Sequence, residues 1–156
     1  MFKFTKKNGM YSKEEKQLLK REFWATFGTN YPRKWMLYDT QIKDVSFKFY
    51  VDNRIARVQL DIEPRDAEKR KIYYEKIESL QTLLREEHLP NALFERHLTL
   101  ENGKTISRIW VELESVNMNR RDDWDRIHHF FATQMHAFEE FFKEYEDYIR
   151  DLDLNT

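Results

Sequence analysis

The sequence predicts an α+β domain in which three helices pack with a roughly five-stranded, mainly antiparallel sheet, in the order α-β-β-β-α-β-β-α. Its 156 residues suit a single domain. Residues 45–62 alternate apolar and polar side chains on both sides of a turn, and residues 94–113 carry apolar residues on both sides of an Asn-Gly pair, which are both typical of β-hairpins. Three other stretches repeat apolar residues every three or four positions, as helices do. We expect one domain over residues 10–150, a mobile N-terminal arm at 1–9 and a frayed tail at 151–156.

The composition excludes several functional classes. Lys and Arg total 27 and Asp and Glu total 28, so the chain is not a strongly basic nucleic-acid binder. Cysteine is absent, which excludes disulfides, thiol nucleophiles and Cys-ligated metals. No apolar run approaches the roughly 20 residues that span a bilayer, and the start carries no signal peptide. We therefore expect a cytoplasmic protein without membrane contact.

The first helix has a clear beginning. Ser12 and Glu15 have the spacing of a capping box, in which each side chain accepts a hydrogen bond from the other residue's backbone amide. Its apolar stripe consists of Leu19, Phe23 and Phe27. Gly28 is a plausible end, because glycine tolerates a left-handed conformation. Residues 35–38 are expected to form a short strand.

Strict alternation over residues 45–51 and 56–62 flanks the turn residues Asp52 and Asn53, so these segments form the first hairpin with one buried face. Pro64 ends the second strand and can open the next helix. Helical spacing of apolar residues then continues to about His88.

The second hairpin carries the most specific local signal. Asn102-Gly103 is the preferred pair for a type I′ turn, in which both central residues need a positive φ. A two-residue turn at this position places His97 opposite Arg108.

The last helix runs from Asn119 or Asp122 to about Arg150 and carries two apolar stripes. The second stripe comprises Phe130, Ala137, Phe141 and Tyr148. Two stripes indicate more than a half-buried helix. Either the first helix covers the second stripe, or another subunit does so through the interface candidates Phe130, Phe141 and Tyr148.

The polar face of the sheet is the first candidate binding surface. If the apolar alternation faces the helices, the other face presents Lys48, Tyr50, Arg57, His97, Arg108 and Trp110. Aromatic rings mixed with cations can stack on bases and neutralise phosphates. The same residues can equally form a solvated face with cross-strand pairs, or a surface for a partner protein.

The order of elements resembles the core of restriction-endonuclease-like folds, which hold a metal ion with acidic residues on two adjacent strands. The low-ranked catalytic candidates are Asp44, Asp61 and Glu63. The match is poor, because Arg65 stands where such enzymes have a lysine, and arginine cannot act as a base. The histidines show no metal-ligand spacing. We expect no metal and no cofactor.

Four segments resemble a bacterial family, the domain-of-unknown-function 4268 family. They are MYSKEE at 10–15, FWATFG at 23–28, ENGKTISRI at 101–109 and DW at 123–124. The resemblance covers almost the whole chain. It implies a link to DNA, because larger members carry the domain beside a nuclease-like domain. It supplies no catalytic residues.

The sequence does not determine the function. The leading interpretation is a non-enzymatic binding or accessory domain, with a link to DNA and with a protein or a second copy of the chain as the favoured partner. Nucleic acid is the other partner considered. The alternatives are a divergent metal-dependent nuclease and a homo-oligomeric scaffold.

Overall fold

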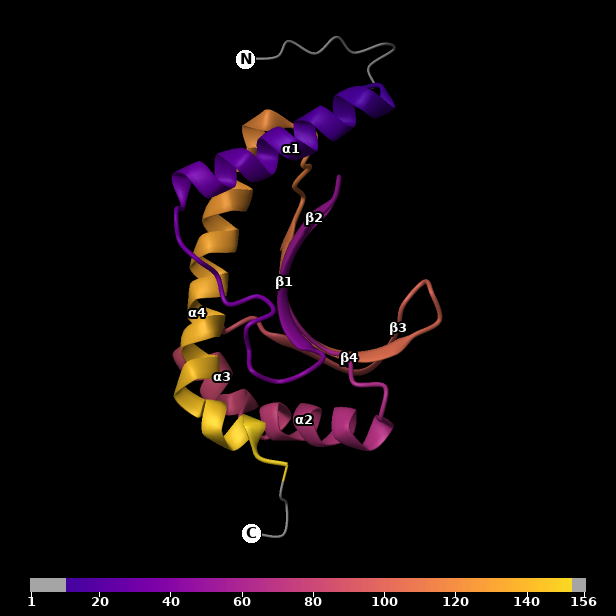
Figure 1. Ribbon diagram of the computed structural model, residues 1–156. Coiled ribbons are helices and arrows are strands. Elements are labelled where there is room, and N and C mark those ends of the chain that lie inside the picture. Colours follow the sequence, from indigo (N-terminus) through magenta and orange to yellow (C-terminus); the bar gives the residue numbers. More distant parts are fainter. Residues whose placement is uncertain (1–10, 153–156) are drawn as a thin grey trace.

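A computed structural model describes residues 11–152 of the chain (Figure 1). The predicted arm at 1–9 and the last four residues lie outside this part. The elements in chain order are α1 (Lys13–Asn30), β1 (Val45–Val51), β2 (Ile55–Ile62), α2 (Ala67–Ser79), α3 (Gln81–Glu87), β3 (Leu93–Thr99), β4 (Thr105–Glu114), the short 3-10 helix η1 (Arg121–Asp123) and α4 (Trp124–Arg150). The α+β class is confirmed, but the described residues form four strands and four α-helices rather than about five strands and three helices.

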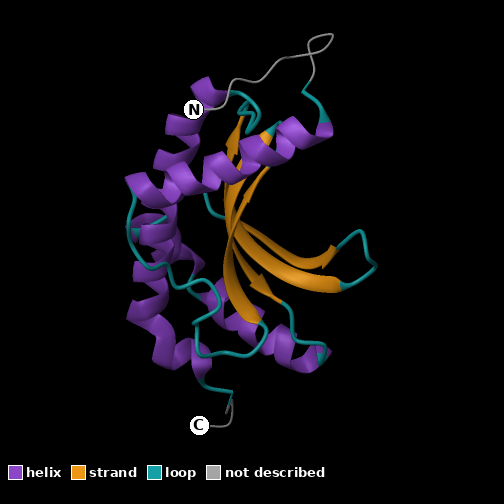
Figure 2. Cartoon of the chain, turned by 45° about the horizontal axis from the view of Figure 1, so that its top comes forward, coloured by secondary structure: helices purple, strands orange, loops and turns teal. Residues whose placement is uncertain are grey.

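The four strands form one antiparallel sheet in the order β1-β2-β4-β3. Both predicted hairpins are present, and β2 joins them by pairing with β4 from Ile55 opposite Glu114 to Ile62 opposite Ser107. The sheet curves strongly, and the helices lie against its convex face (Figures 1 and 2). No helix within the described residues covers the concave face. The polar residues of the strands face this open side.

The start of α1 confirms the predicted capping box. The Glu15 amide donates to Ser12 Oγ at 3.1 Å, and the Ser12 amide donates to Glu15 Oε1 at 3.3 Å. The helix does not stop at Gly28 but continues to Asn30, where the Tyr31 amide still donates to the Phe27 carbonyl. The predicted glycine stop is therefore wrong, since Gly28 keeps an ordinary helical backbone.

The predicted strand at residues 35–38 is absent. A carboxylate on α4 takes the place of a strand partner, because Glu139 accepts hydrogen bonds from the Met36 amide and from Arg33 Nη2, both at 2.6 Å. Leu37 has a positive φ of 40°, which interrupts an extended backbone. The segment is thus a loop held against α4.

The predicted helix before His88 breaks at Leu80 into α2 and α3. At the break the Ser79 hydroxyl donates to the Lys76 carbonyl at 2.6 Å, in competition with the helical hydrogen bonds. Beyond it, the His88 ring packs edge-on against Phe141 of α4, with 5.8 Å between ring centroids. The break therefore brings the end of α3 against α4.

The second stripe of α4 is partly covered from within the chain. Phe141 is fully buried, so it is not available to another subunit as the sequence suggested. The covering element near Phe141 is α3, whereas the α1 ring of Trp24 stacks instead on Phe131 of the main stripe at 5.6 Å. Phe130 is half-buried beside Phe131, and Tyr148 is 47% exposed. A subunit contact at Phe130 and Tyr148 stays a prediction.

The second hairpin forms, but its turn is not the predicted type I′. Gly103 has a φ of 85°, whereas Asn102 has no positive φ. The Gly103 amide donates to the Leu100 carbonyl, and the Leu100 amide donates to the Lys104 carbonyl, both at 2.8 Å. These bonds are typical of a type I turn followed by a left-handed glycine, which gives a three-residue loop at 101–103.

The two described glycines allow a matched test of this turn. Neither would bring a new Cβ within 4 Å of another atom, so only backbone conformation distinguishes them. We expect Gly103→Ala to lower the free energy of unfolding by about 1 kcal/mol, because alanine is strained at positive φ. Gly28→Ala should raise it by about 0.5–1 kcal/mol, because alanine favours the helix. Denaturant unfolding measures both, and changes of the same sign would contradict this turn.

His128 lies in the aromatic core between α1 and α4. Its ring centroid is 4.4 Å from that of Phe23 and 5.3 Å from that of Phe27, and the side chain is buried. Burial lowers the pKa of the imidazole below its ordinary value of 6.5, because the charged form loses its hydration. The ring is therefore neutral in the folded protein at pH 7.

This depressed pKa predicts a loss of stability in acid. Below about pH 6.5 the unfolded chain binds a proton on His128 that the folded chain does not, so the free energy of unfolding falls as the pH is lowered. The slope for one proton is at most about 1.4 kcal/mol per pH unit. Urea unfolding between about pH 7 and pH 5 should show a smaller slope for His128→Leu than for the wild type. The exposed His129→Leu control should keep the wild-type slope, and equal slopes for all three proteins would contradict the assignment.

Candidate functional site

The concave face brings together every predicted binding-face residue except His97. Strand pairing sets their side chains in adjoining rows across the sheet. The rows are Tyr50, Arg57 and Glu112; Lys48, Gln59 and Trp110; and Ser46, Asp61 and Arg108. Alternation alone predicted this set, because residues two apart on a strand share a face.

A β-bulge removes His97 from the face. Glu95 rather than His97 lies opposite Arg108, and the register shifts between Glu95 and Leu98. A bulge sets two residues of one strand against one of its partner, which reverses the alternation beyond it. His97 lines a pocket with Ser107 and residues of α2, on the side of the sheet that carries the helices. The predicted placement of His97 on the open face is therefore wrong.

Asp61 is the centre of the concave face. Its carboxylate is 2% exposed and accepts two hydrogen bonds from Arg108, from Nε at 2.7 Å and from Nη2 at 3.1 Å. Gln59 Nε2 donates to Oδ2 at 3.0 Å, and Lys48 Nζ lies 3.2 Å from the same oxygen. Both oxygens are thus occupied by donors from three strands. A buried carboxylate is stable only with such partners.

Lys48 links this centre to the end of β2. Its Nζ is 3.0 Å from Glu63 Oε2 as well as 3.2 Å from Asp61 Oδ2. Burial alone would lower the pKa of the ammonium, but Glu63 and Asp61 together outweigh it and hold the pKa above its ordinary value. Lys48 is therefore a fixed positive charge between two carboxylates.

Arg57 differs from the other cations of the face. Its guanidinium lies 4.0 Å above the centre of the Tyr50 ring, and its Nε donates to Gln59 Oε1 at 3.1 Å. No carboxylate among residues 11–152 lies within ion-pair distance of it. Burial first, and then the nearby charge of Arg108, lower the pKa of the guanidinium below its ordinary value. The group stays charged at neutral pH.

Trp110, on the same face, carries a hydrogen-bond donor without an acceptor. Its indole Nε1 is buried and has no hydrogen-bond partner within the described part of the chain. Trp110 pairs with Gln59 in the next row from Arg57. A buried donor without an acceptor carries a free-energy cost, which the folded chain bears at this position.

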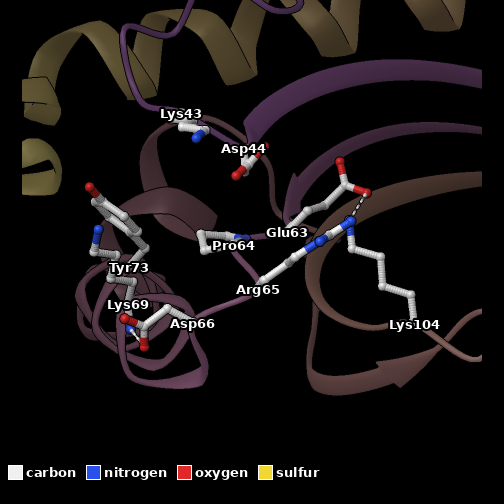
Figure 3. A pocket seen from close by; sticks show the side chains of 9 residues that line it. All are labelled: Lys43, Asp44, Glu63, Pro64, Arg65, Asp66, Lys69, Tyr73 and Lys104. Carbon is white, nitrogen blue, oxygen red and sulfur yellow. Dashed lines mark hydrogen bonds and ion pairs between the residues drawn. The ribbon is translucent and has the colours of Figure 1, made fainter.

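A pocket of about 560 Å³ lies where β2 passes into α2 (Figure 3). Its cationic lining comes from three separate segments and consists of Lys43, Arg65, Lys69 and Lys104. Glu63 also lines it and lies 3.7 Å from Lys104 Nζ. Because Glu63 also pairs with Lys48, it joins the pocket to the concave face. No sequence signal brings these cations together, since their proximity depends on the tertiary fold.

The three acidic nuclease candidates do not share one metal position. Asp44 and Glu63 line the pocket, where the Glu63 amide donates to the Asp44 carbonyl at 2.7 Å. Asp61 instead faces Arg108, and it meets Glu63 only at Lys48. Within the described residues, the group of potential ligands close enough for one metal is a different one, at His88 on the surface of α3 and α4. Catalysis by this acidic trio has no geometric support.

These observations define a class of protein: an α+β domain that presents the concave face of a curved antiparallel sheet. On this face Arg57 forms no ion pair, and the Trp110 indole has no hydrogen-bond acceptor within the described residues. The chain belongs to the domain-of-unknown-function family 4268, whose family model matches residues 19–146, as the resemblance predicted. No curated protein and no solved structure matches it. None of the helices within residues 11–152 has both the length and the apolarity that a bilayer crossing demands.

We expect the pair of Asp61 and Arg108 to dominate the stability of the concave face. Asp61→Asn should lower the free energy of unfolding by roughly 3 kcal/mol, because it leaves the largely buried Arg108 without its carboxylate and Lys48 with Glu63 alone. Glu112→Gln, an exposed carboxylate on the same face, should change it by less than about 0.5 kcal/mol. Urea unfolding of both variants measures the difference, and similar small effects would show that Asp61 does not hold the face together.

Proposed function

We propose that this protein is a non-enzymatic binding domain whose concave face binds single-stranded nucleic acid. The observation that carries the proposal is the half-buried Arg57, which lies beside Arg108 without a carboxylate partner of its own. A desolvated arginine next to another cation favours an anionic ligand. A backbone phosphate supplies that charge.

A single strand suits this face better than a duplex. Tyr50 is 37% exposed and already carries the Arg57 guanidinium on its ring, and Trp110 lies one row away. Unpaired bases stack on aromatic rings and guanidinium planes, whereas the bases of a duplex are stacked on each other. The net charge of −1 gives no general attraction to nucleic acid. Binding therefore depends on these local groups.

Metal-dependent cleavage is not the function that the geometry favours. A metal ion needs carboxylate oxygens with free lone pairs, but those of Asp61 accept from Arg108, Gln59 and Lys48. Glu63 is likewise held between Lys48 and Lys104. The binding proposal needs no rearrangement of these ion pairs.

Replacement of Arg57 provides the decisive test. Arg57→Gln should weaken binding of a single-stranded oligonucleotide about tenfold. It should also reduce the slope of log Kd against log salt by the share of roughly one phosphate contact. Tyr50→Leu should weaken binding but leave the salt dependence unchanged, because it removes stacking and no charge. Fluorescence anisotropy over a salt series measures both quantities.

The matched control is Arg54→Gln, which removes the same charge from an exposed position in the turn between β1 and β2. It should bind like the wild type. Equal losses for Arg54→Gln and Arg57→Gln, or no binding by the wild type at low salt, would overturn the proposal. Binding of an acidic peptide alone would assign the face to a protein partner. Magnesium-dependent cleavage that Glu63→Gln abolishes would favour the nuclease alternative.

A further inference from the structure

The pocket at the end of β2 has the size and the charge of a site for a phosphorylated group. Its volume of about 560 Å³ falls within the range of small-molecule sites in proteins. Figure 3 shows its lining from the loop before β1, the connection from β2 into α2, and the second hairpin. Three chain segments thus converge on one space.

The cations that line the pocket outnumber the carboxylates that line it. Lys43, Arg65 and Lys69 line it and form no ion pair among the described residues. Of the lining acids, Glu63 is already held by Lys48 and Lys104. The Asp66 carboxylate caps α2 by accepting from the Glu68 and Lys69 amides.

Asp44 also lines the pocket, and it forms no ion pair among the described residues. The loop that carries it enters the pocket with a left-handed backbone, since Asp44 has a φ of 63°. Asp66 keeps its negative charge, because the amides that it caps are neutral, so the lining combines four cations with three carboxylates. The surplus of positive charge favours an anionic ligand.

We propose that this pocket binds the terminal phosphate of the strand that lies on the concave face, an inference that rests on the proposed function. A phosphate monoester at a strand end carries about −1.5 to −2 charges at pH 7, more than an internal diester carries. Lysine and arginine side chains are the usual partners of such a group. A strand end therefore matches the pocket better than an internal phosphate.

The position of the pocket fits an end of the binding track. Arg57 and Glu63 lie on the same side of β2 and its continuation, about 20 Å apart at a rise of ~3.3 Å per residue. A strand that lies along β2 from Arg57 would pass Lys48, whose Nζ is 3.0 Å from Glu63. Glu63 in turn pairs with Lys104 in the pocket, so the pocket lies at one end of this line of residues. Beyond Glu63, Pro64 turns the chain toward α2, whose first turn forms part of the pocket lining.

The test compares three versions of one oligonucleotide of about 8 nucleotides, labelled on an internal base so that both ends are free. One carries a 5′-phosphate, one a 3′-phosphate and one hydroxyl groups at both ends. We expect one phosphorylated end to improve the Kd for the full chain about tenfold over the hydroxyl version. The phosphorylated oligonucleotide that binds more tightly than the hydroxyl version identifies which end of the strand enters the pocket.

Variants separate this inference from the proposed function. Arg65→Gln combined with Lys69→Gln should abolish the preference for the phosphorylated end and change the Kd of the hydroxyl version less than about twofold. Both side chains are exposed, so the double variant should stay folded. The matched control, Lys20→Gln with Arg21→Gln on the exposed surface of α1, should keep the preference.

Arg57→Gln should weaken all three oligonucleotides and keep the ratio between them. Equal affinity for the three, with the Arg57 dependence intact, would overturn the terminal-phosphate site and leave the proposed function standing. A preference that survives the Arg65 and Lys69 substitutions would also overturn it. Failure of all three oligonucleotides to bind would overturn both proposals.

Discussion

A buried carboxylate on an uncovered face is the constraint on which the rest of this structure depends. The open face of an antiparallel sheet is ordinarily solvated, yet Asp61 is 1% exposed there, with Lys48, Gln59 and Arg108 against its carboxylate. An ionised group in such a place needs donors on every side, and Arg108, Gln59 and Lys48 supply them. These donors lie on β1, β2 and β4, so the ion cluster exists only in one register of three strands. A slip of one residue would turn the carboxylate into the apolar core.

The same cluster determines which cation of the concave face forms no ion pair. Asp61 holds Arg108 in a two-point hydrogen bond and shares Lys48 with Glu63, so neither acid pairs with Arg57, and the exposed Glu112 opposite Arg57 forms no ion pair with it. Tyr50 and Gln59 fix the Arg57 side chain in its place without neutralising it. The Arg57 side chain is thereby preorganised, so the proposed ligand would meet an arginine whose desolvation and orientation are already established by folding. Binding chemistry and fold stability thus come from one arrangement of side chains.

Most local features of this fold could be predicted from the sequence, apart from the helix stop at Gly28 and the exact turn type at Asn102, whereas features that depend on tertiary contacts could not. The capping box at Ser12 and both hairpins follow from signals within a few residues of each other. The bulge that displaces His97 and the break at Leu80 have no such signal, because packing between distant elements selects them. Asp61 illustrates the limit most clearly. As a sequence feature it resembled a metal ligand, and only the pairing of β2 with β4 reveals Arg108 opposite it.

The concave face and the pocket depend on different parts of the fold although Glu63 joins them. Arg57 keeps its position through the Asp61 cluster, which belongs to the paired strands. Lys104 instead follows the hairpin loop, where its amide donates to Asn102 Oδ1 at 2.9 Å, and Gly103 supplies the left-handed residue that closes the turn. Strain introduced at this loop therefore displaces the lysine of the pocket before it disturbs the ion cluster of the sheet. Because the concave face and the pocket have separate structural support, the two proposed activities, binding of a strand and recognition of its end, should be separable by mutation.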